Sequence, residues 1–139
     1  MREQRASQMV EGLRHAGLKL TPQRLAIVHE LAGDVSHPTA QELFERLQPS
    51  LPTMSFATVY NTLAALSERR LCAARSLVRG AVRFDPNVEP HDHAVCDACG
   101  LVRDVPVPAA ERREPRIKGF SVERVERVYR GSCADCRSA

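Results

Sequence analysis

The feature that most constrains this chain is a ten-residue stretch, His91-Asp92-His93-Ala94-Val95-Cys96-Asp97-Ala98-Cys99-Gly100. Side chains two residues apart on a strand point to the same face, so His91 and His93 can address one ion. Cys96 and Cys99, followed by Gly100, are typical of a tight turn that directs two sulfurs toward another ion. The stretch therefore predicts metal binding of two kinds, by neighbouring parts of one segment.

A second Cys-x-x-Cys pair, Cys133 and Cys136, matches the pair at Cys96 and Cys99. Four thiolates from two such turns form a tetrahedral site that suits zinc, closed to water and therefore structural. Such a site contributes about 10–16 kcal/mol of apparent binding free energy, enough to fold a small module. A redox dithiol pair or a rubredoxin-like iron are the competing interpretations, and two matched turns favour zinc. The fifth cysteine, Cys72, is expected to be a buried bystander.

A further set of candidate ligands combines imidazoles with carboxylates. Its members are His37, Asp85, His91, His93 and Asp104. A mixed nitrogen and oxygen site favours Fe(II), Mn(II), Co(II) or Zn(II) over Cu(I). Spacing alone also allows these to be separate surface residues. If they share an ion, ligands from both halves of the chain make its binding a ligand-controlled domain closure.

Charge and proline content predict two modules. Residues 1–84 hold 11 Lys and Arg against 7 Asp and Glu, whereas residues 85–139 hold 9 against 10. A basic first part suggests a polyanionic partner. Two prolines within residues 85–90 predict a short, stiff connection. We therefore expect a first domain at 1–84, a hinge at 85–90 and a second domain at 91–139, which is too small to fold without a metal or a partner chain.

The sequence carries no sign of export or membrane insertion. Its longest apolar runs are far shorter than a membrane span. The first residues, Met-Arg-Glu-Gln-Arg, lead into polar residues rather than an apolar signal core. Paired cysteines that read as metal ligands suit a reducing compartment. A cytoplasmic location is the expectation.

The first module reads as four helices followed by a hairpin. Helices are predicted at residues 3–15, 22–32, 40–48 and 56–67, with Thr21, Thr39 and Ser55 as N-caps and Thr39–Glu42 as a capping box. Strands are predicted at 71–78 and 81–84. Helices followed by a basic two-stranded ribbon are the pattern of a winged helix-turn-helix, whose last helix enters the DNA major groove.

The fourth helix has an unusual outer face. Phe56, Val59, Leu63 and Leu66 form the stripe expected to be buried. No charged residue occurs between Ser55 and Ser67, and the opposite side carries Ala57, Thr58, Tyr60 and Asn61. Small and uncharged side chains allow close approach to base edges, although burial of both sides in a core remains an alternative. The arginines of the ribbon, Arg75, Arg79 and Arg83, are expected to contact phosphates.

The second module is predicted to contain strands at 91–95, 101–105 and 121–129, with a helix across 108–118. The fold class is therefore α+β: an N-terminal winged helix-turn-helix domain followed by a small α/β domain with a four-cysteine zinc site.

Several motifs together resemble the ferric uptake regulator (Fur) family. They are Thr21-Pro22-Gln23-Arg24, His37-Pro38-Thr39-Ala40, Ala57-Thr58-Val59-Tyr60-Asn61-Thr62-Leu63, Arg83-Phe84-Asp85, the His91–Gly100 stretch and Cys133-Ala134-Asp135-Cys136. The resemblance covers nearly the whole chain. Asp rather than Glu at Asp104 makes the chain most similar to the peroxide-sensing PerR branch.

The resemblance implies a homodimeric repressor of an inverted-repeat DNA operator. It implies structural zinc on the four cysteines and a regulatory Fe(II) or Mn(II) ion at His37, Asp85, His91, His93 and Asp104. In the PerR branch, Fe(II) at that site reacts with peroxide, and the histidine matching His37 or His91 is oxidised. This oxidation releases the repressor from DNA. Tyr60 and Asn61 are implied to lie at the DNA, and Lys19 to reach phosphate or the minor groove.

Three alternatives remain open at this point. The first is an iron- or manganese-uptake regulator of the same family, without peroxide sensing. The second is a metallohydrolase using the His/Asp cluster, for which Glu89 is the nearest candidate base. The third is a zinc-ribbon adaptor that binds protein. The family's additional metal site, which combines the Asp of His-x-His with a late histidine, is doubtful because Val122–Arg130 contains no histidine.

Overall fold

The chain divides into two compact units, Met1–Val88 and Glu89–Ala139, in a computed structural model that describes residues 1–78 and 80–138. The boundary falls within the segment 85–90 predicted as a hinge. Among the described helices, none is both long and apolar enough to cross a membrane.

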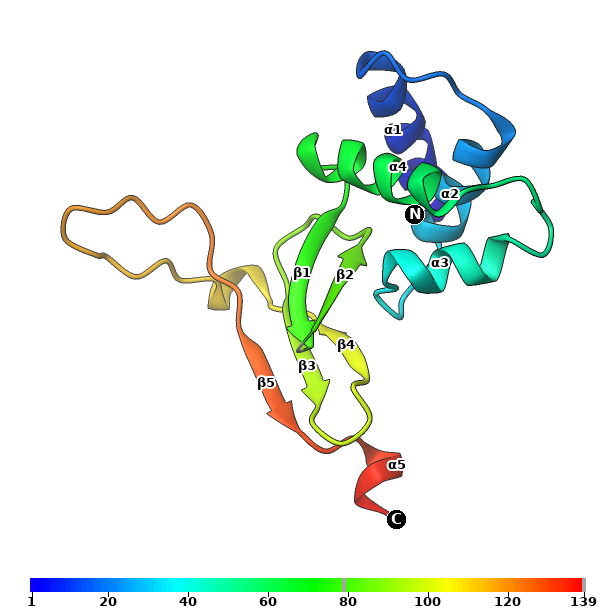
Figure 1. Ribbon diagram of the computed structural model, residues 1–139. Coiled ribbons are helices and arrows are strands. Elements are labelled where there is room, and N and C mark those ends of the chain that lie inside the picture. The colour runs from blue at the N-terminus through cyan, green and yellow to red at the C-terminus, as the bar shows by residue number, and fades with distance from the viewer. Residues whose placement is uncertain (79, 139) are drawn as a thin grey trace. The chain divides into compact units, whose positions relative to one another are not determined.

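Unit 1 is built on four helices, α1 (Arg2–His15), α2 (Pro22–Ala32), α3 (Ala40–Leu47) and α4 (Phe56–Glu68), shown in Figure 1. Each of α2, α3 and α4 begins at the predicted cap: the hydroxyls of Thr21, Thr39 and Ser55 accept the N–H of the residue three positions later. Such caps satisfy amides that the first turn leaves without partners. The three helix starts are thus fixed by local sequence.

One apolar core joins these helices. Its fully buried members include Met9, Leu13, Ile27, Leu31, Leu43, Val59, Leu63 and Leu66. After α4 the chain forms an antiparallel hairpin, β1 (Ala73–Val78) and β2 (Ala81–Asp85). Cys72 and Phe84 extend the same core into this hairpin. Helices α1–α4 with the β1–β2 wing form the winged helix-turn-helix predicted from sequence.

Unit 2 contains a three-stranded sheet in the order β4-β3-β5. β3 (Asp92–Cys96) is central, pairing antiparallel with β4 (Val102–Val105) and parallel with β5 (Val128–Gly131). A short helix, α5 (Ala134–Arg137), follows β5 and carries the last cysteine pair. The sheet and α5 appear together at the yellow-green to red end of the ribbon in Figure 1.

Two predictions for unit 2 are wrong. The helix across 108–118 is reduced to a single 3₁₀ turn, η1 (Ala109–Glu111). Pro115 lacks an N–H donor, and residues before a proline avoid the α-helical region, so a longer helix is interrupted. The strand predicted at 121–129 begins only at Val128, because the parallel pairing with β3 covers residues 128–131. Residues 112–127 instead form a loop that extends away from the sheet (Figure 1).

Candidate metal centres and nucleic-acid interface

The four cysteines converge in unit 2. Their sulfur atoms all lie within 4.8 Å of one another. The sulfurs of Cys99 and Cys133 are 3.8 Å apart. Zn–S bonds of about 2.3 Å in a tetrahedron place neighbouring sulfurs about 3.8 Å apart. The spacing of the thiols therefore fits a closed zinc site, as predicted.

Backbone hydrogen bonds hold the cysteine turns in place and donate to one of the sulfurs. Gly100, in the left-handed region with φ 77°, closes the turn after Cys99, and its N–H donates to the Cys96 carbonyl. The Cys133 N–H donates to the Cys96 sulfur at 3.3 Å, and this bond, with a further one from Cys99, lowers the pKa of Cys96 to about 6. The Cys133, Cys99 and Cys96 thiols raise the pKa of Cys136 to about 12. The sulfurs cannot all ionise together without a compensating cation, which zinc supplies.

A second candidate ligand set in unit 2 consists of His93 on β3, Asp104 on β4, and His91, the residue directly before β3. His93 stands directly opposite Asp104 in the register, and its Nε2 is 3.5 Å from the Asp104 Oδ1 atom. The Nε2 atom of His91 is 3.1 Å from the same oxygen. The three ligand atoms lie within 4.8 Å of one another, which is the convergence that the His-x-His spacing predicted.

A carbonyl group fixes the tautomer of His91. Its Nδ1 lies 2.6 Å from the Glu89 carbonyl oxygen, which can only accept a hydrogen bond. Nδ1 therefore carries a proton and donates to this carbonyl, and Nε2 is the nitrogen that faces Asp104 and could bind an ion. Metal-binding histidines commonly have this arrangement, with one nitrogen held by a carbonyl and the other free for the ion.

Unit 1 contributes a separate pair of candidate ligands. His37 lies between α2 and α3, and Asp85 is the last residue of β2. The His37 Nε2 atom is 3.3 Å from the Asp85 Oδ2 atom, and both side chains are buried. A metal ion bound at about 2.0–2.2 Å by both atoms requires a spacing of this size. These residues fit an ion as well as an ordinary ion pair.

His37 adopts a strained backbone that the wing holds in place. Its φ of 57° lies in the left-handed region, which is unfavourable for a residue that precedes a proline. The Arg83 guanidinium donates to the His37 carbonyl at 3.0 Å, and the Phe84 N–H donates to the Pro38 carbonyl at 2.9 Å. Strain of this kind costs about 1–3 kcal/mol and typically occurs at functional positions.

Asp85 has two further partners that sequence reasoning did not find. Its Oδ1 accepts the Asn87 N–H at 2.9 Å, and its Oδ2 accepts from the Arg75 Nε at 3.1 Å. Arg75 was expected to contact phosphate, but its side chain is only 11% exposed and lies against Asp85. Its guanidinium binds a carboxylate inside unit 1, so Arg75 is not available as the predicted phosphate contact.

Asp92 is not a solvated carboxylate. It is buried, and its Oδ1 accepts the Arg127 N–H at 2.9 Å, which ties the segment before β5 to β3. This hydrogen bond gives the Asp92 carboxylate a structural role.

The outer face of α4 is open in unit 1. Ser55, Ala57, Tyr60 and Asn61 are exposed, and Thr58 is half-buried. Burial of this helix on both sides, the alternative left by the sequence, is therefore wrong for the chain alone. An uncharged, hydrogen-bonding face remains available for base edges.

Phe56 was predicted to join the buried stripe, and this prediction is wrong. Its side chain is 41% exposed and packs edge-to-face on Phe44 of α3, with ring centroids 6.0 Å apart. Tyr60 lies beside it at 6.4 Å. Because Phe56 begins the helix, its ring reaches the neighbouring α3 side rather than the core. It enlarges the exposed face of α4.

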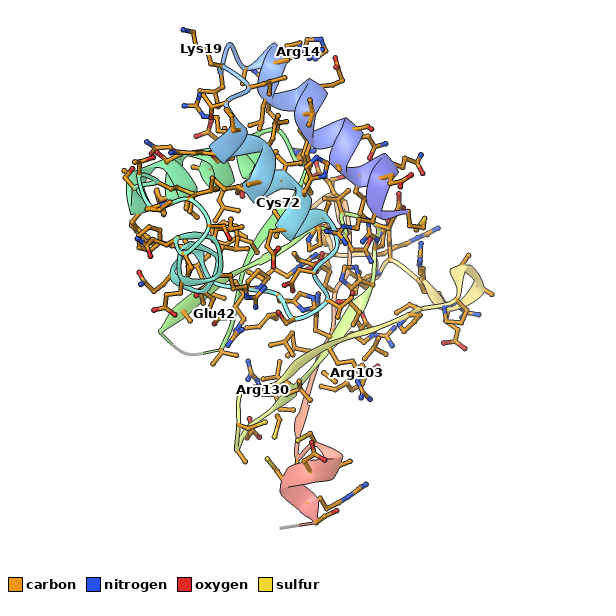
Figure 2. The ribbon with its side chains drawn as sticks, turned by 90° about the vertical axis from the view of Figure 1, so that its right-hand side faces the viewer. Arg14, Lys19, Glu42, Cys72, Arg103 and Arg130 are labelled. Atoms are coloured by element: carbon orange, nitrogen blue, oxygen red, sulfur yellow. The ribbon has the colours of Figure 1, made fainter. Side chains whose placement is uncertain are left out.

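The basic residues around this face differ in availability. Lys19 is exposed and extends from the loop between α1 and α2 (Figure 2). Arg83 is directed to the His37 carbonyl and lies 3.7 Å from Glu42, so it is not a free phosphate contact. Arg79, also predicted to contact DNA, lies outside the described residues.

Comparisons with known proteins agree with this architecture. The family model described as Ferric uptake regulator family matches residues 15–128. The peroxide-responsive repressor PerR of Staphylococcus aureus is 32% identical over 138 residues, covering 97% of this chain and 93% of that protein. The Helicobacter pylori ferric uptake regulator Fur, whose structure reveals three functional metal binding sites, gives a TM-score of 0.76 at 19% identity, covering 100% of this chain and 95% of that chain. A ferric uptake regulator from Pseudomonas aeruginosa, solved with manganese, gives 0.68 at 26% identity over 88% and 95% of the two chains.

A winged helix joined to a small domain with a four-cysteine site and a His/Asp ligand set defines a metal-responsive, DNA-binding transcription regulator. The chain belongs to the ferric uptake regulator family, and its relatives include peroxide-responsive repressors. Members of this family are regulators of transcription rather than enzymes.

Proposed function

We propose that this protein is a metal-dependent transcriptional repressor that binds an inverted-repeat operator as a homodimer in the cytoplasm. The observation that carries the proposal is the convergence of His91, His93 and Asp104 beside a complete four-cysteine cluster in the same small unit. One set suits permanent zinc, and the other suits an exchangeable Fe(II) or Mn(II) ion.

The proposal assigns one regulatory ion to ligands of both units. His37 and Asp85 of unit 1 would bind it together with His91, His93 and Asp104 of unit 2. Support comes from each set separately: nitrogen and oxygen atoms at ligand spacing in unit 1, and a fixed His91 tautomer in unit 2. Because the ligands belong to both units, binding favours the arrangement in which they meet, so metal occupancy selects a conformation.

The exposed face of α4 would read DNA. Ser55, Ala57, Thr58, Tyr60 and Asn61 supply small or hydrogen-bonding groups for base edges, and Lys19 supplies a phosphate contact. A homodimer presents two such helices to half-sites about 34 Å or a multiple apart. The regulatory ion would lower the free-energy cost of holding both helices at that spacing.

Peroxide sensing is part of the same proposal. Iron, when bound, supplies the one-electron chemistry that cleaves the peroxide O–O bond. The imidazole of His37 or His91 gains one oxygen atom, and the other oxygen of the peroxide leaves as water. An oxidised ring is a poorer ligand, so repression would end. The similarity to PerR and the presence of Asp104 support this step.

The DNA-binding test begins with a random duplex library, because the operator is undefined. Manganese-loaded protein selects its sites, and affinity is then measured with and without manganese while the zinc is kept. We expect at least about tenfold tighter binding with manganese, the lower range of ordinary allosteric coupling. Equal affinities would overturn the metal switch.

The peroxide test uses Fe(II)-loaded protein in the absence of oxygen. Addition of peroxide followed by mass spectrometry of peptides is expected to show one added oxygen on the peptide of His37 or His91. Manganese-loaded protein is the matched control and should stay unmodified. If the iron form is also unmodified, the protein is an iron- or manganese-uptake regulator without peroxide sensing.

A further inference from the structure

We propose that Arg75 is a built-in cationic competitor that weakens the regulatory site and so sets the metal concentration at which the protein responds. The inference rests on the proposed assignment of Asp85 to that site. It concerns contacts within unit 1 alone.

The contact geometry shows why Arg75 matters to an incoming ion. The Asp85 Oδ2 atom is shared by the His37 Nε2 atom at 3.3 Å and the Arg75 Nε atom at 3.1 Å. Oδ2 is therefore the oxygen that an ion held with His37 would use. A guanidinium is always protonated, so this oxygen already carries a positive partner. Any divalent cation that binds Oδ2 approaches a fixed positive charge.

Two effects of Arg75 on metal affinity oppose each other. Its hydrogen bond orients a ligand carboxylate, and losing such an outer partner commonly weakens metal binding about 10–100-fold. Its positive charge repels a divalent cation at short range, which weakens binding while Arg75 is present. The net sign depends on whether anything else orients Asp85.

The Asn87 N–H resolves this balance. It donates to the Asp85 Oδ1 atom at 2.9 Å from the backbone directly after β2. The carboxylate therefore keeps its orientation when Arg75 is removed, and the orienting contribution of Arg75 is largely redundant. Its charge is not redundant, so repulsion decides the effect. Removing the charge should tighten the site.

Arg75 also has a role when no regulatory ion is bound. Asp85 is 1% exposed, and a buried carboxylate without a counter-charge is strongly destabilising. Arg75 supplies this counter-charge, with its Nε atom 3.1 Å from the Asp85 Oδ2 atom. The same guanidinium thus stabilises the metal-free repressor and opposes metal binding, which couples the two properties in opposite directions.

The test measures manganese affinity of the zinc-loaded protein by competition with a fluorescent chelator. Arg75→Met should bind manganese about tenfold or more tightly than wild type, whereas Arg75→Lys, which keeps the charge but not the planar fork, should stay within about threefold. Arg14→Met removes an exposed guanidinium that pairs with Glu11 on α1, and it controls for net charge (Figure 2). Metal-free Arg75→Met should also unfold at a lower temperature.

Each outcome bears on the inference. Weaker manganese binding by Arg75→Met, or equal changes in the Met and Lys variants, would overturn it in favour of an orienting role. If Arg75→Met does not fold, Arg75→Gln removes the charge while keeping a donor and takes its place. Failure of the proposed site is separable: wild type and His93→Ala would then bind manganese equally, whatever Arg75 does.

Discussion

The two metal sites proposed for this protein differ in where their candidate ligands come from. All four cysteines belong to unit 2 and come from two turns. The proposed regulatory ion would instead take His91, His93 and Asp104 from unit 2 together with His37 and Asp85 from unit 1. A site contained in one unit stabilises that unit. A site divided between units can report on their arrangement. Ligand placement would thus distinguish the proposed structural ion from the proposed regulatory one.

The hydrophobic cores of the units sharpen this contrast. Unit 1 buries apolar side chains from all four helices, including Leu13, Leu43 and Leu66. Within the described part of unit 2, the buried apolar residues are Val95, Cys96 and Val102. So small a core cannot offset the conformational entropy of some fifty residues. We therefore expect unit 2 to need zinc, a partner chain or both in order to fold, and unit 1 to fold on its own core.

The largest expected effect comes from breaking the zinc site. Cys133→Ser should unfold unit 2, because zinc contributes about 10–16 kcal/mol in such sites and a whole domain is commonly stable by only about 5–15 kcal/mol. Circular dichroism and limited proteolysis are expected to show a surviving helical unit 1. A unit 2 that stays folded and protected without zinc would contradict the division of roles.

Next in size is the loss of a regulatory ligand. His93→Ala should lower manganese affinity more than about 100-fold. Loss of a group that only hydrogen-bonds to a ligand commonly lowers metal affinity about 10–100-fold, and loss of the ligand itself should cost more. Zinc content should stay at one per chain, since the cysteines are separate. His29→Ala, an exposed histidine on α2, is the matched control. Loss of zinc from His93→Ala would mean that the two sites are not independent.

The pH dependence of zinc binding gives a third test. Cys136, with its pKa raised to about 12 by the neighbouring thiols, carries its proton in the metal-free cluster at any ordinary pH. Zinc must displace that proton, so zinc affinity rises with pH. The pKa of Cys99 is also raised, so zinc displaces at least two protons. Each displaced proton contributes about a 100-fold change in zinc affinity between pH 6 and pH 8, measured by chelator competition. An affinity that did not vary with pH would exclude thiolate ligation by Cys136.

A DNA-face variant should leave both metal sites intact. Asn61→Ala is expected to cost about 1–3 kcal/mol of operator binding free energy, as for a base contact. The slope of the logarithm of the binding constant against the logarithm of the salt concentration should not change. Lys19→Ala is expected to lower the slope by about one, as for a phosphate contact. Both variants should bind zinc and manganese as wild type does. Equal effects on the slope would contradict the assignment of Asn61 to bases.

What the sequence predicted well is local. The caps at Thr21, Thr39 and Ser55 need only residues within one turn, and the Cys-x-x-Cys pairs need only their spacing. The wrong predictions depended on partners distant in sequence. β5 is limited to the residues that pair with β3, and Phe56 packs on Phe44 of another helix.

The contact of Arg75 with Asp85 joins residues ten positions apart on two strands. No short motif encodes it, and a basic ribbon residue is easily read as a phosphate contact. The His37 conformation is likewise set by Arg83 and Phe84, 46 and more residues away in the chain. The candidate ligands follow from short sequence motifs, whereas the groups that surround them are brought there by the tertiary fold.

The smallest expected effect concerns the one cysteine outside both sites. Cys72 is buried in unit 1 (Figure 2), and burial raises its pKa to about 11, although a hydrogen bond with Ser67 acts in the opposite direction. Because its pKa is higher in the folded than in the unfolded chain, its contribution to stability is complete below about pH 9 and is lost as pH rises through about 11. Zinc-loaded protein should therefore show no rapidly reacting thiol at pH 8. Chelation should release four fast thiols and leave one slow one, and a fifth fast thiol would show that unit 1 had opened as well.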